Sequence, residues 1–393
     1  MPLVTPSASP SIQLAELHKQ HAYRTRLTLD SPQGVHVTIG QQNYLSFCSN
    51  DYLGLANDPR VCDATVNAIR HYGVGSGASQ LISGYTSLHS QLEQQLADFF
   101  NYPRCVLFSS GYMANFGVIS SFATQKSLIV EDKLNHASLI DAAKYAGSKL
   151  KRYRHRNVEH AKKIIASEKN SQGLLVTDGV FSMEGSIAPL DELIELKQHS
   201  QYKLVIDDAH GIGVLGKHGR GSIEHENINS SEIDILIGTF GKSFGVSGAF
   251  VLSSEENIEY LIQTARTLIY TTAPPAALAA GALQSLDIII NEPERRKRLH
   301  DNIEYFRRCV KQTHLDMLDS VTAIQSLILN DNNKALSFSQ ALKSHGLLAL
   351  AIRPPTVPKN TSRLRITLSS EHTHEHIDKL ISTLLDIEKL HPK

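Results

Sequence analysis

A lysine set among glycines and hydroxyl-bearing residues is the first feature of this sequence that could do chemistry. Residues 239–245 read TFGKSFG, and Lys242 offers an amine that can form a Schiff base. Upstream, residues 205–211 read VIDDAHG, an apolar run that ends in acidic residues and His210. Asp207 offers a carboxylate that can hold a protonated pyridine nitrogen. Pyridoxal 5′-phosphate (PLP) requires such an amine and such a carboxylate from a protein.

Other polar residues follow apolar runs that read as strands. Residues 109–112 form a turn that opens a helical stretch, so the N–H groups of Gly111 and Tyr112 suit a phosphate. His136 and Ser182 lie in further loops of this kind. Ligands of open α/β sheets bind outside the carboxyl ends of the strands. We therefore expect these residues at one edge of a sheet.

Three other interpretations of these motifs lack support. Residues 241–243 read GKS, but a phosphate loop needs a glycine where Leu236 stands. Asp207 and His210 could be half of a metal site, yet no third ligand with suitable spacing is apparent, and we predict no metal. No G-x-G-x-x-G follows the first strand of a βαβ unit, which argues against a dinucleotide-binding domain.

Short apolar runs alternate with helical patterns through the middle of the chain. Seven runs read as strands: 105–108, 127–130, 149–153, 173–177, 203–207, 234–237 and 249–252. Helical patterns lie between most of them, for example 139–145, 159–167 and 190–197. This alternation predicts the α/β class, with an open, mostly parallel seven-stranded sheet covered on both faces.

The two ends of the chain have their own organisation. Four segments precede or close the central region: a Ser/Pro-rich arm over 1–10, a helix over 12–23, a short β region over 34–47 and a helix over 275–290. Strands near 323–329, 347–352 and 364–368 and an amphipathic helix from 377 to 387 then predict a smaller α/β unit. We predict an N-terminal segment 1–50, a large domain 51–291 and a small domain 292–393.

Composition narrows the possible partners and the compartment. The 393 residues carry 39 basic and 39 acidic side chains, so no global charge attracts nucleic acid or acidic membranes. The basic stretch 149–156 is most simply a solvated strand end and loop. The four cysteines form no CxxC pair, the N-terminus lacks a signal pattern, and no apolar run approaches the roughly 20 residues of a membrane span. We expect a soluble, reduced, cytoplasmic protein.

The order of the motifs resembles a known family. Asp-x-x-His followed by Thr-x-x-Lys within TFGKxFG resembles the fold-type I PLP enzymes, and more narrowly the α-oxoamine synthases. The resemblance covers nearly the whole chain, and its further segments stand in the expected order at 50–55, 73–77, 83–89 and 179–185. Residues 351–358, AIRPPTVP, are most similar to the biotin-pathway branch of that family.

This resemblance implies a role for each cofactor-binding residue. Lys242 would hold PLP and later act as acid and base at the substrate Cα. Asp207 would pair with the ring nitrogen, and His136 would stack on the ring. Contacts to the ring oxygen and the phosphate would come from the remaining residues, Ser182, His210, Gly111, Tyr112 and Thr239. Catalysis would thus rest on Lys242, His136 and Asp207.

The resemblance also implies the substrates. Arg365 would bind the amino acid carboxylate, with Asn50 nearby, and Arg24 and Thr356 would contact the acyl substrate. The implied reaction is a decarboxylative condensation of L-alanine with a pimeloyl thioester. The sequence leaves open whether coenzyme A or an acyl carrier protein carries the pimeloyl group.

Other members of the family remain as alternatives. A sister enzyme such as glycine C-acetyltransferase would share the PLP site, although Gln80 stands where several sisters carry arginine. A non-catalytic subunit that has lost the lysine is disfavoured because Lys242 is present. The resemblance further implies a homodimer, in which residues 76–79 and 269–272 complete a neighbour's site.

Overall fold

The computed structural model describes residues 9–168 and 172–390 and divides the chain into two compact units. Unit 1 consists of Met1–Gly54, Met183–Ser186 and Lys297–Lys393, and unit 2 of Leu55–Ser182 and Ile187–Arg296. Most of the predicted arm over 1–10 lies outside the described residues. The chain passes from one unit to the other after Gly54 and after Arg296, whereas the predicted boundaries follow residues 50 and 291.

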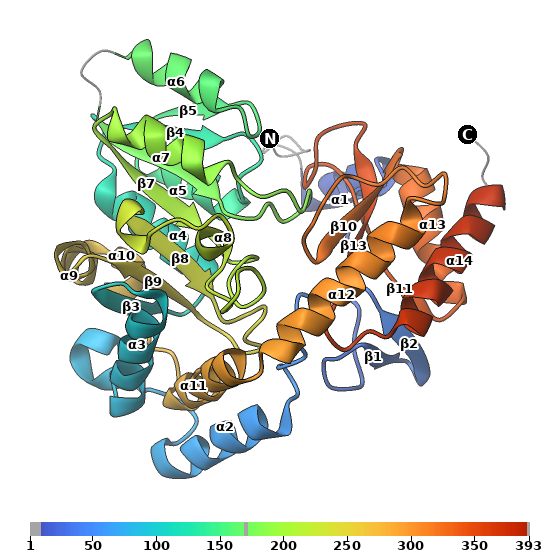
Figure 1. Cartoon of the computed structure of the whole chain (residues 1–393), viewed down its shortest axis with the longest axis horizontal. Coiled ribbons are helices and arrows are strands. Elements are labelled where there is room, and N and C mark those ends of the chain that lie inside the picture. The colour runs from blue at the N-terminus through green and yellow to red at the C-terminus, as the bar shows by residue number, and fades with distance from the viewer. Residues whose placement is uncertain (1–8, 169–171, 391–393) are drawn as a thin grey trace. The chain divides into compact units, whose positions relative to one another are not determined.

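Unit 2 is built on a seven-stranded sheet with the strand order β3-β9-β8-β7-β6-β4-β5 (Figure 1). The strands are β3 Arg104–Phe108, β4 Leu128–Asp132, β5 Lys149–Tyr153, β6 Gly173–Asp178, β7 Tyr202–Asp207, β8 Ile235–Thr239 and β9 Ala249–Ser253. From β8 to β5 all neighbours are parallel, and β9 is antiparallel to both β8 and β3. All seven predicted strands are present, and the predicted fold class is confirmed.

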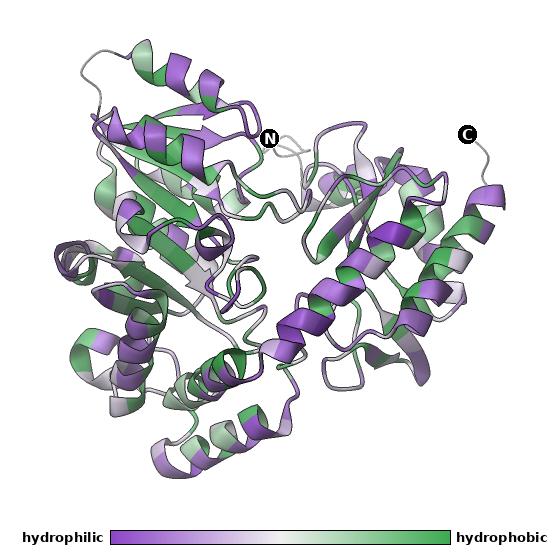
Figure 2. Cartoon of the chain, in the orientation of Figure 1, coloured by the Kyte–Doolittle hydropathy of each residue, from purple (hydrophilic) through white to green (hydrophobic). Residues whose placement is uncertain are grey.

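Helices pack on this sheet through apolar side chains. The helices that lie wholly within unit 2 are α2 Pro59–Tyr72, η1 Gln80–Gly84, α3 Ser87–Phe100, α4 Gly111–Phe122, α5 Ala137–Tyr145, α6 Val158–Ala166, α7 Leu190–Gln198, α8 Ser222–His225, η2 Ser230–Glu232, α9 Glu255–Thr264, α10 Arg266–Ile269 and α11 Ala276–Asn291. Buried residues of α4, α5 and α9 form one cluster with β3, β6, β7, β8 and β9. The strands are correspondingly hydrophobic in Figure 2. This core holds the strand ends, and the loops that follow them, in fixed positions.

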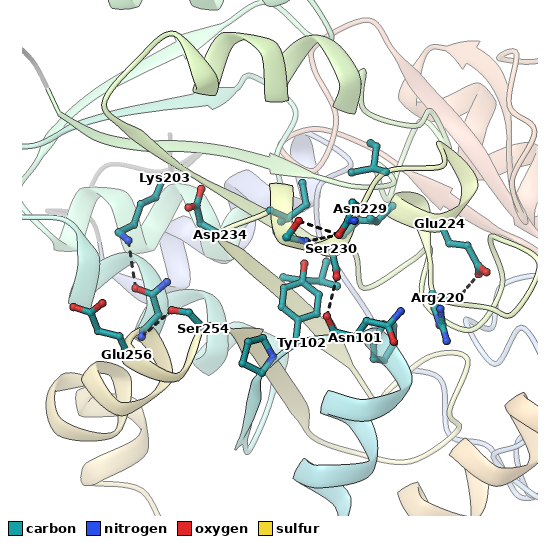
Figure 3. A pocket seen from close by; sticks show the side chains of 18 residues that line it. Asn101, Tyr102, Lys203, Arg220, Glu224, Asn229, Ser230, Asp234, Ser254 and Glu256 are labelled. Carbon is teal, nitrogen blue, oxygen red and sulfur yellow. Dashed lines mark hydrogen bonds between the residues drawn. The ribbon is translucent and has the colours of Figure 1, made fainter.

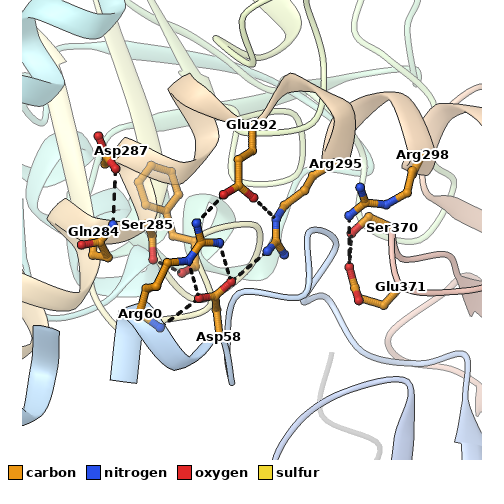
Figure 4. A network of polar contacts seen from close by, with 11 residues as sticks. Asp58, Arg60, Gln284, Ser285, Asp287, Glu292, Arg295, Arg298, Ser370 and Glu371 are labelled. Carbon is orange, nitrogen blue, oxygen red and sulfur yellow. Dashed lines mark hydrogen bonds and ion pairs between the residues drawn. The ribbon is translucent and has the colours of Figure 1, made fainter. Parts of the chain in front are cut away.

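Four charged residues near the two ends of unit 2 in the sequence form one network of ion pairs (Figure 4). Asp58 caps α2, and its carboxylate lies 2.9 Å from Arg60 and 2.8 Å from Arg295. Arg60 and Arg295 both contact Glu292 as well. The ring of alternating charges thus ties the start of α2 to the start of α12 (Pro293–Val310).

Unit 1 contains two three-stranded sheets. One has the order β1-β2-β11 and the other β10-β13-β12. The strands are β1 His36–Ile39, β2 Gln42–Ser46, β10 Ile324–Asn330, β11 Leu347–Leu348, β12 Leu350–Ile352 and β13 Ser362–Thr367, and the remaining helices are α1 Pro10–Lys19, α13 Asn332–Ser344 and α14 His374–Leu390. The short piece Met183–Ser186 belongs here because Arg363 lies 2.9 Å from the Glu184 carboxylate and also donates to the Met183 carbonyl.

Two predicted elements of unit 1 are wrong in detail. The helix predicted over 12–23 ends at Lys19, because His21 takes a left-handed conformation with φ 51° that stops it. The strand predicted over 347–352 is two strands, since β11 pairs with β2 and β12 pairs with β13. A single apolar run therefore changes sheets at Ala349.

Candidate active site

A cavity of about 170 Å³ in unit 2 lies at the carboxyl ends of β6, β7 and β8. All eight residues that the sequence predicted to contact a cofactor line it: Gly111, Tyr112, His136, Ser182, Asp207, His210, Thr239 and Lys242. They come from the ends of four strands and from the start of α4. The prediction that they meet at one sheet edge is confirmed.

Lys242 stands in a tight turn between the antiparallel strands β8 and β9. The Gly245 N–H donates to the Lys242 carbonyl at 2.9 Å, and the Val246 N–H donates to the Phe240 carbonyl at 2.8 Å. Gly245 has φ 67°, and a Cβ there would lie 2.2 Å from the Ala56 nitrogen. Only glycine fits this position, and the turn holds the half-buried lysine over the cavity.

Buried side chains anchor the same turn. The Phe240 and Phe244 rings pack on Phe250 of β9, with centroids 5.1 and 6.3 Å from its ring. The Ser243 hydroxyl donates to the Ile212 carbonyl at 2.6 Å. The apolar and hydroxyl residues around Lys242 therefore fix the backbone of the turn, while the lysine lines the cavity.

Asp207 ends β7 and is buried, with 8% of its surface exposed. Its carboxylate accepts hydrogen bonds from Asn115 Nδ2 at 2.6 Å and from the Ala209 N–H at 3.1 Å. The two contacts fix the orientation of the side chain, because each carboxylate oxygen accepts one of them. The cavity thus contains a buried carboxyl group whose orientation is fixed.

The start of α4 is distant from the lysine turn in sequence but lines the same cavity. Ser110 caps the helix by accepting from the Met113 N–H at 3.3 Å. The N–H groups of Gly111 and Tyr112 are the first of α4 and have no partner within the helix. The Thr239 hydroxyl donates to the Gly248 carbonyl at 2.9 Å and accepts from the Gly241 N–H at 3.2 Å.

His136 caps α5 and is tied to β6. Its N–H donates to Asp178 Oδ2 at 3.0 Å, and its ring Nδ1 accepts from the Ser138 N–H at 3.3 Å. The ring keeps an exposed surface at the cavity. Burial nevertheless lowers the pKa of His136, with the Lys242 charge acting in the same direction and the Asp207 charge opposing it. A neutral ring at physiological pH follows.

The cavity is also lined by three polar residues that were not predicted from the sequence, namely Asn115, Ser138 and Asp178. Asn115 lies one helical turn after Gly111, and Ser138 lies two residues after His136, so their spacing could have indicated them. Asp178 pairs in register with Asp207, and burial followed by the Asp207 charge raises its pKa well above the usual range for a carboxyl. Two carboxyl groups on neighbouring strands thus face the same cavity.

The four predicted substrate-binding residues belong to unit 1, where the structure brings them together in pairs. Arg365 of β13 is buried, and its Nη2 donates to Asn50 Oδ1 at 3.1 Å. Arg24 Nη2 donates to the Thr356 hydroxyl at 3.3 Å. Each arginine thus has a polar partner that was predicted with it.

A larger cavity of about 800 Å³ lies at the opposite edge of the unit 2 sheet (Figure 3). It is lined by Tyr102 before β3, Lys203 at the start of β7, Asp234 before β8 and Ser254 after β9. Two of its charged groups are engaged with neighbours, since Lys203 donates to Asn257 and Asp234 pairs with Lys197. Size alone therefore does not mark the chemistry, which gathers at the carboxyl ends of the strands.

Two kinds of feature are absent from the described ranges 9–168 and 172–390. Within them, no group of three or more His, Cys, Asp or Glu side chains is placed to hold a metal ion. Among the helices of that part of the chain, none has the length and apolar character needed to cross a bilayer.

Comparison with known proteins agrees with the motifs. A family model described as aminotransferase class I and II matches residues 42–384. A protein from Methylococcus capsulatus named 8-amino-7-oxononanoate synthase is 46% identical over 377 residues, which cover 96% of this chain and 97% of that protein.

Solved structures share the fold over most of their length. A serine palmitoyltransferase variant from S. paucimobilis with a bound PLP–myriocin aldimine has a TM-score of 0.92 at 28% identity and covers 97% of this chain and 96% of its own. An 8-amino-7-oxononanoate synthase from Francisella tularensis is 34% identical with a TM-score of 0.79, covering 88% of this chain and 98% of its own. The chain therefore belongs to the aminotransferase class I and II family and, within it, to the 8-amino-7-oxononanoate synthases.

Proposed function

We propose that this protein uses PLP to condense L-alanine with a pimeloyl thioester, giving 8-amino-7-oxononanoate, CO₂ and the free thiol, a step of biotin synthesis. The observation that carries the proposal is the meeting of all eight predicted cofactor residues in one cavity. Its chemical identity is supported by the 46% identity to a relative of that name over nearly the whole chain.

The residues of the cavity fit PLP. Asn115 Oδ1 and Asp178 Oδ1 are buried there and have no hydrogen-bond partner within the described part of the chain. A Cβ at Gly111 would meet only Thr239, at 3.9 Å, so the cavity is open above the first N–H groups of α4. Unsatisfied polar atoms beside an anion-binding helix start are what a phosphorylated, polar ring would use.

The proposed contacts follow the chemistry of each group. Asp207 would hold the protonated ring nitrogen, and Gly111 and Tyr112 would hold the phosphate. Thr239 would join them by turning its hydroxyl from the Gly248 carbonyl. His136 would stack on the ring, and the ring oxygen would receive hydrogen bonds from Ser182 and His210. When bound, PLP supplies an electron sink for the pair left at the amino acid Cα.

Lys242 is the proposed acid and base. Its Nζ would bind the cofactor aldehyde, and once displaced by the substrate amine it would take the proton from Cα of alanine. The same amine would return a proton to that carbon after CO₂ has left. The turn between β8 and β9 keeps this group in place, which supplies proximity.

The substrate contacts are proposed for the residues of unit 1. Arg365 would bind the alanine carboxylate through its planar pair of N–H donors, with Asn50 orienting the guanidinium from 3.1 Å. Arg24 and Thr356 would contact the pimeloyl chain. Arg24 carries the charge suited to the far carboxylate of that chain, which a shorter acetyl group lacks.

We also propose that the active form is a homodimer. Large apolar side chains are exposed around the glycine-rich loop: Val74 at 78%, Ile82 at 80% and Tyr270 at 71%. Ser79 pairs with Thr272, so these segments belong to one surface. Exposed apolar residues gathered in this way are typical of a protein–protein interface.

Product identification tests the function. Purified protein with PLP and L-alanine is given pimeloyl-CoA or the pimeloyl carrier protein, and the products are analysed by mass spectrometry. We expect 8-amino-7-oxononanoate, with the better carrier giving the larger kcat/KM. Faster turnover of glycine with acetyl-CoA would show that the protein is instead a sister enzyme.

A further inference from the structure

A chain of three hydrogen bonds connects two of the residues that line the cavity. Asn115 Nδ2 donates to Asp207 Oδ2 at 2.6 Å and to Ser138 Oγ at 2.7 Å. Ser138 Oγ in turn lies 2.7 Å from Nδ1 of His136. Asn115 and Ser138 have 1% and 0% of their surface exposed, so water does not replace these contacts. The chain thus runs from β7 through α4 to α5.

The donors and acceptors of this chain have a fixed order. The Asp207 carboxylate only accepts, so Asn115 must turn its NH₂ group toward it. The second hydrogen of that NH₂ group goes to Ser138 Oγ, and the Ser138 hydroxyl hydrogen is then directed to His136 Nδ1. The Ser138 N–H, 3.3 Å from the same Nδ1, also requires an acceptor there. Nδ1 therefore carries no proton.

We propose that Asn115 and Ser138 are positioning residues that fix His136 as the neutral tautomer with its proton on Nε2. Nε2 has no partner in the portion of the chain that the structure describes, and the residue lines the cavity. Its N–H is thus available to a bound ligand. That this ligand is the PLP-bound amino acid rests on the proposed function, but the tautomer itself does not.

Charged groups on every neighbouring element bear on this assignment. Asp207 on β7 and Asp141 on α5 favour the protonated ring, whereas Lys242 and burial oppose it, burial being the largest effect. Asp178 on β6 accepts from the His136 backbone N–H and not from the ring. Protonation of Nδ1 would in addition turn the buried Ser138 hydroxyl away from its acceptor, which leaves that hydroxyl unpaired.

Asn115→Leu tests whether Asn115 sets the tautomer of His136 or only stabilises the fold, because the substitution leaves His136 and Ser138 in place. Without the Asn115 donor, Ser138 Oγ is free to accept from Nδ1–H, and the preference for the Nε2–H tautomer weakens. We expect the tautomer ratio to fall about tenfold, the effect of losing one oriented hydrogen bond. Asn115→Ala removes the same donor without adding a bulky apolar side chain, and it replaces the leucine variant in the test if that variant does not fold.

The readout is the ¹⁵N and ¹³C chemical shift of the His136 ring in histidine-labelled protein, before and after PLP is added. Loss of one signal set in His136→Asn assigns the resonances. Ser121→Ala, which removes a buried hydroxyl further along α4, is the matched control and should leave the ratio unchanged. Activity with alanine and the pimeloyl thioester is measured on the same samples.

A His136 ring with its proton on Nδ1, or a ratio unchanged in both Asn115 variants, would overturn the inference even if the product forms. If the Asn115 variants show the expected fall in the tautomer ratio but the wild-type protein makes no product, the inference is supported and the proposed function is contradicted. If both hold, kcat should fall with the tautomer ratio, while KM for the thioester changes less.

Discussion

The Asp207 carboxylate is placed by contacts that an amide could not reproduce. It accepts from both Asn115 and the Ala209 N–H, so an NH₂ group at this position would face another donor. We predict that Asp207→Asn lowers kcat by on the order of 100-fold or more, the usual cost of removing a preorganised charge. PLP retention, followed by its absorption after gel filtration, should fall as well.

Asp191→Asn is the control for that substitution, because Asp191 is exposed on α7 and does not line the cavity. It should keep both activity and PLP. Full activity of Asp207→Asn would remove the proposed role of the carboxylate.

Glu131 of β4 gives a pH dependence of stability. Its side chain is fully buried, and burial raises its pKa from 4.5 to about 7 against the opposing charge of Arg152. Between these pH values the unfolded chain releases a proton that the folded chain keeps, so stability falls as pH rises. We predict that Glu131→Gln makes this fall shallower, by up to about 1.4 kcal/mol per pH unit.

The measurement is the thermal midpoint at pH 4.5, 6 and 7.5, compared with that of Glu159→Gln, an exposed glutamate on α6. The Glu159→Gln curve should parallel the wild type. A Glu131→Gln curve that also parallels the wild type would show that Glu131 does not titrate in this range.

Residues of the site were predictable where they stand in loops after strands. Lys242, Asp207 and His136 are ionisable residues in glycine-rich or apolar surroundings, and this contrast marks them in the sequence. Asn115 and Ser138 are ordinary helix residues in type, and only their spacing from Gly111 and His136 indicates that they lie near the cavity. Their importance comes from contacts between segments 92 and 23 residues apart, which no local pattern records.

At the scale of elements, the turn between β8 and β9 positions the lysine, and Gly245 is its most restricted residue. We predict that Gly245→Ala loses PLP and stability, because an added Cβ would meet the Ala56 nitrogen at 2.2 Å. The left-handed backbone alone costs about 1–2 kcal/mol and overpacking about 1–3 kcal/mol more. Absorption of bound PLP and the thermal midpoint measure both effects.

Gly40→Ala is matched in backbone conformation, since Gly40 has φ 55° but nothing within 4 Å of an added Cβ. It should cost only the conformational part and leave PLP bound. Equal losses in the two variants would mean that the close approach to Ala56 is unimportant.

Six of the seven central strands were predictable as short, mostly apolar runs, which stand out between helical patterns, whereas the edge strand β5 reads KLKRY. The run over 347–352 has the same local character, yet its two halves pair with different partners. The ends of elements such as α1 depend on single backbone conformations, here that of His21. Pairing and end points are set by the rest of the fold.

At the scale of the whole molecule, the exposed apolar residues around the loop 76–79 bear on assembly. We predict that Ile82→Asp, at a residue 80% exposed, converts a dimer into a monomer, because a buried charge in an interface is costly. Light scattering after size-exclusion chromatography measures the mass. Activity should fall with the dimer if the loop contributes to a neighbour's site.

Val321→Asp introduces the same charge at an apolar residue of unit 1 that is 45% exposed and should leave the mass unchanged. Wild-type protein that is monomeric and fully active would contradict the proposed assembly.

The composition of the units is the part of the fold least visible in the sequence. Met183–Ser186 belongs to unit 1 although unit 2 surrounds it in sequence. The reason is long-range, since Ser326 and Arg363 bind the Met183 carbonyl across more than 140 residues. Composition shifts alone indicate where a chain changes character, not which distant segments join.

The most direct test of the account is the site at which PLP binds. The protein is loaded with PLP, reduced with borohydride and digested, and the labelled peptide is identified by mass spectrometry. We predict one phosphopyridoxyl group per chain, on Lys242, and none in Lys242→Ala. A label on another lysine, or no label in protein that still makes 8-amino-7-oxononanoate, would contradict it.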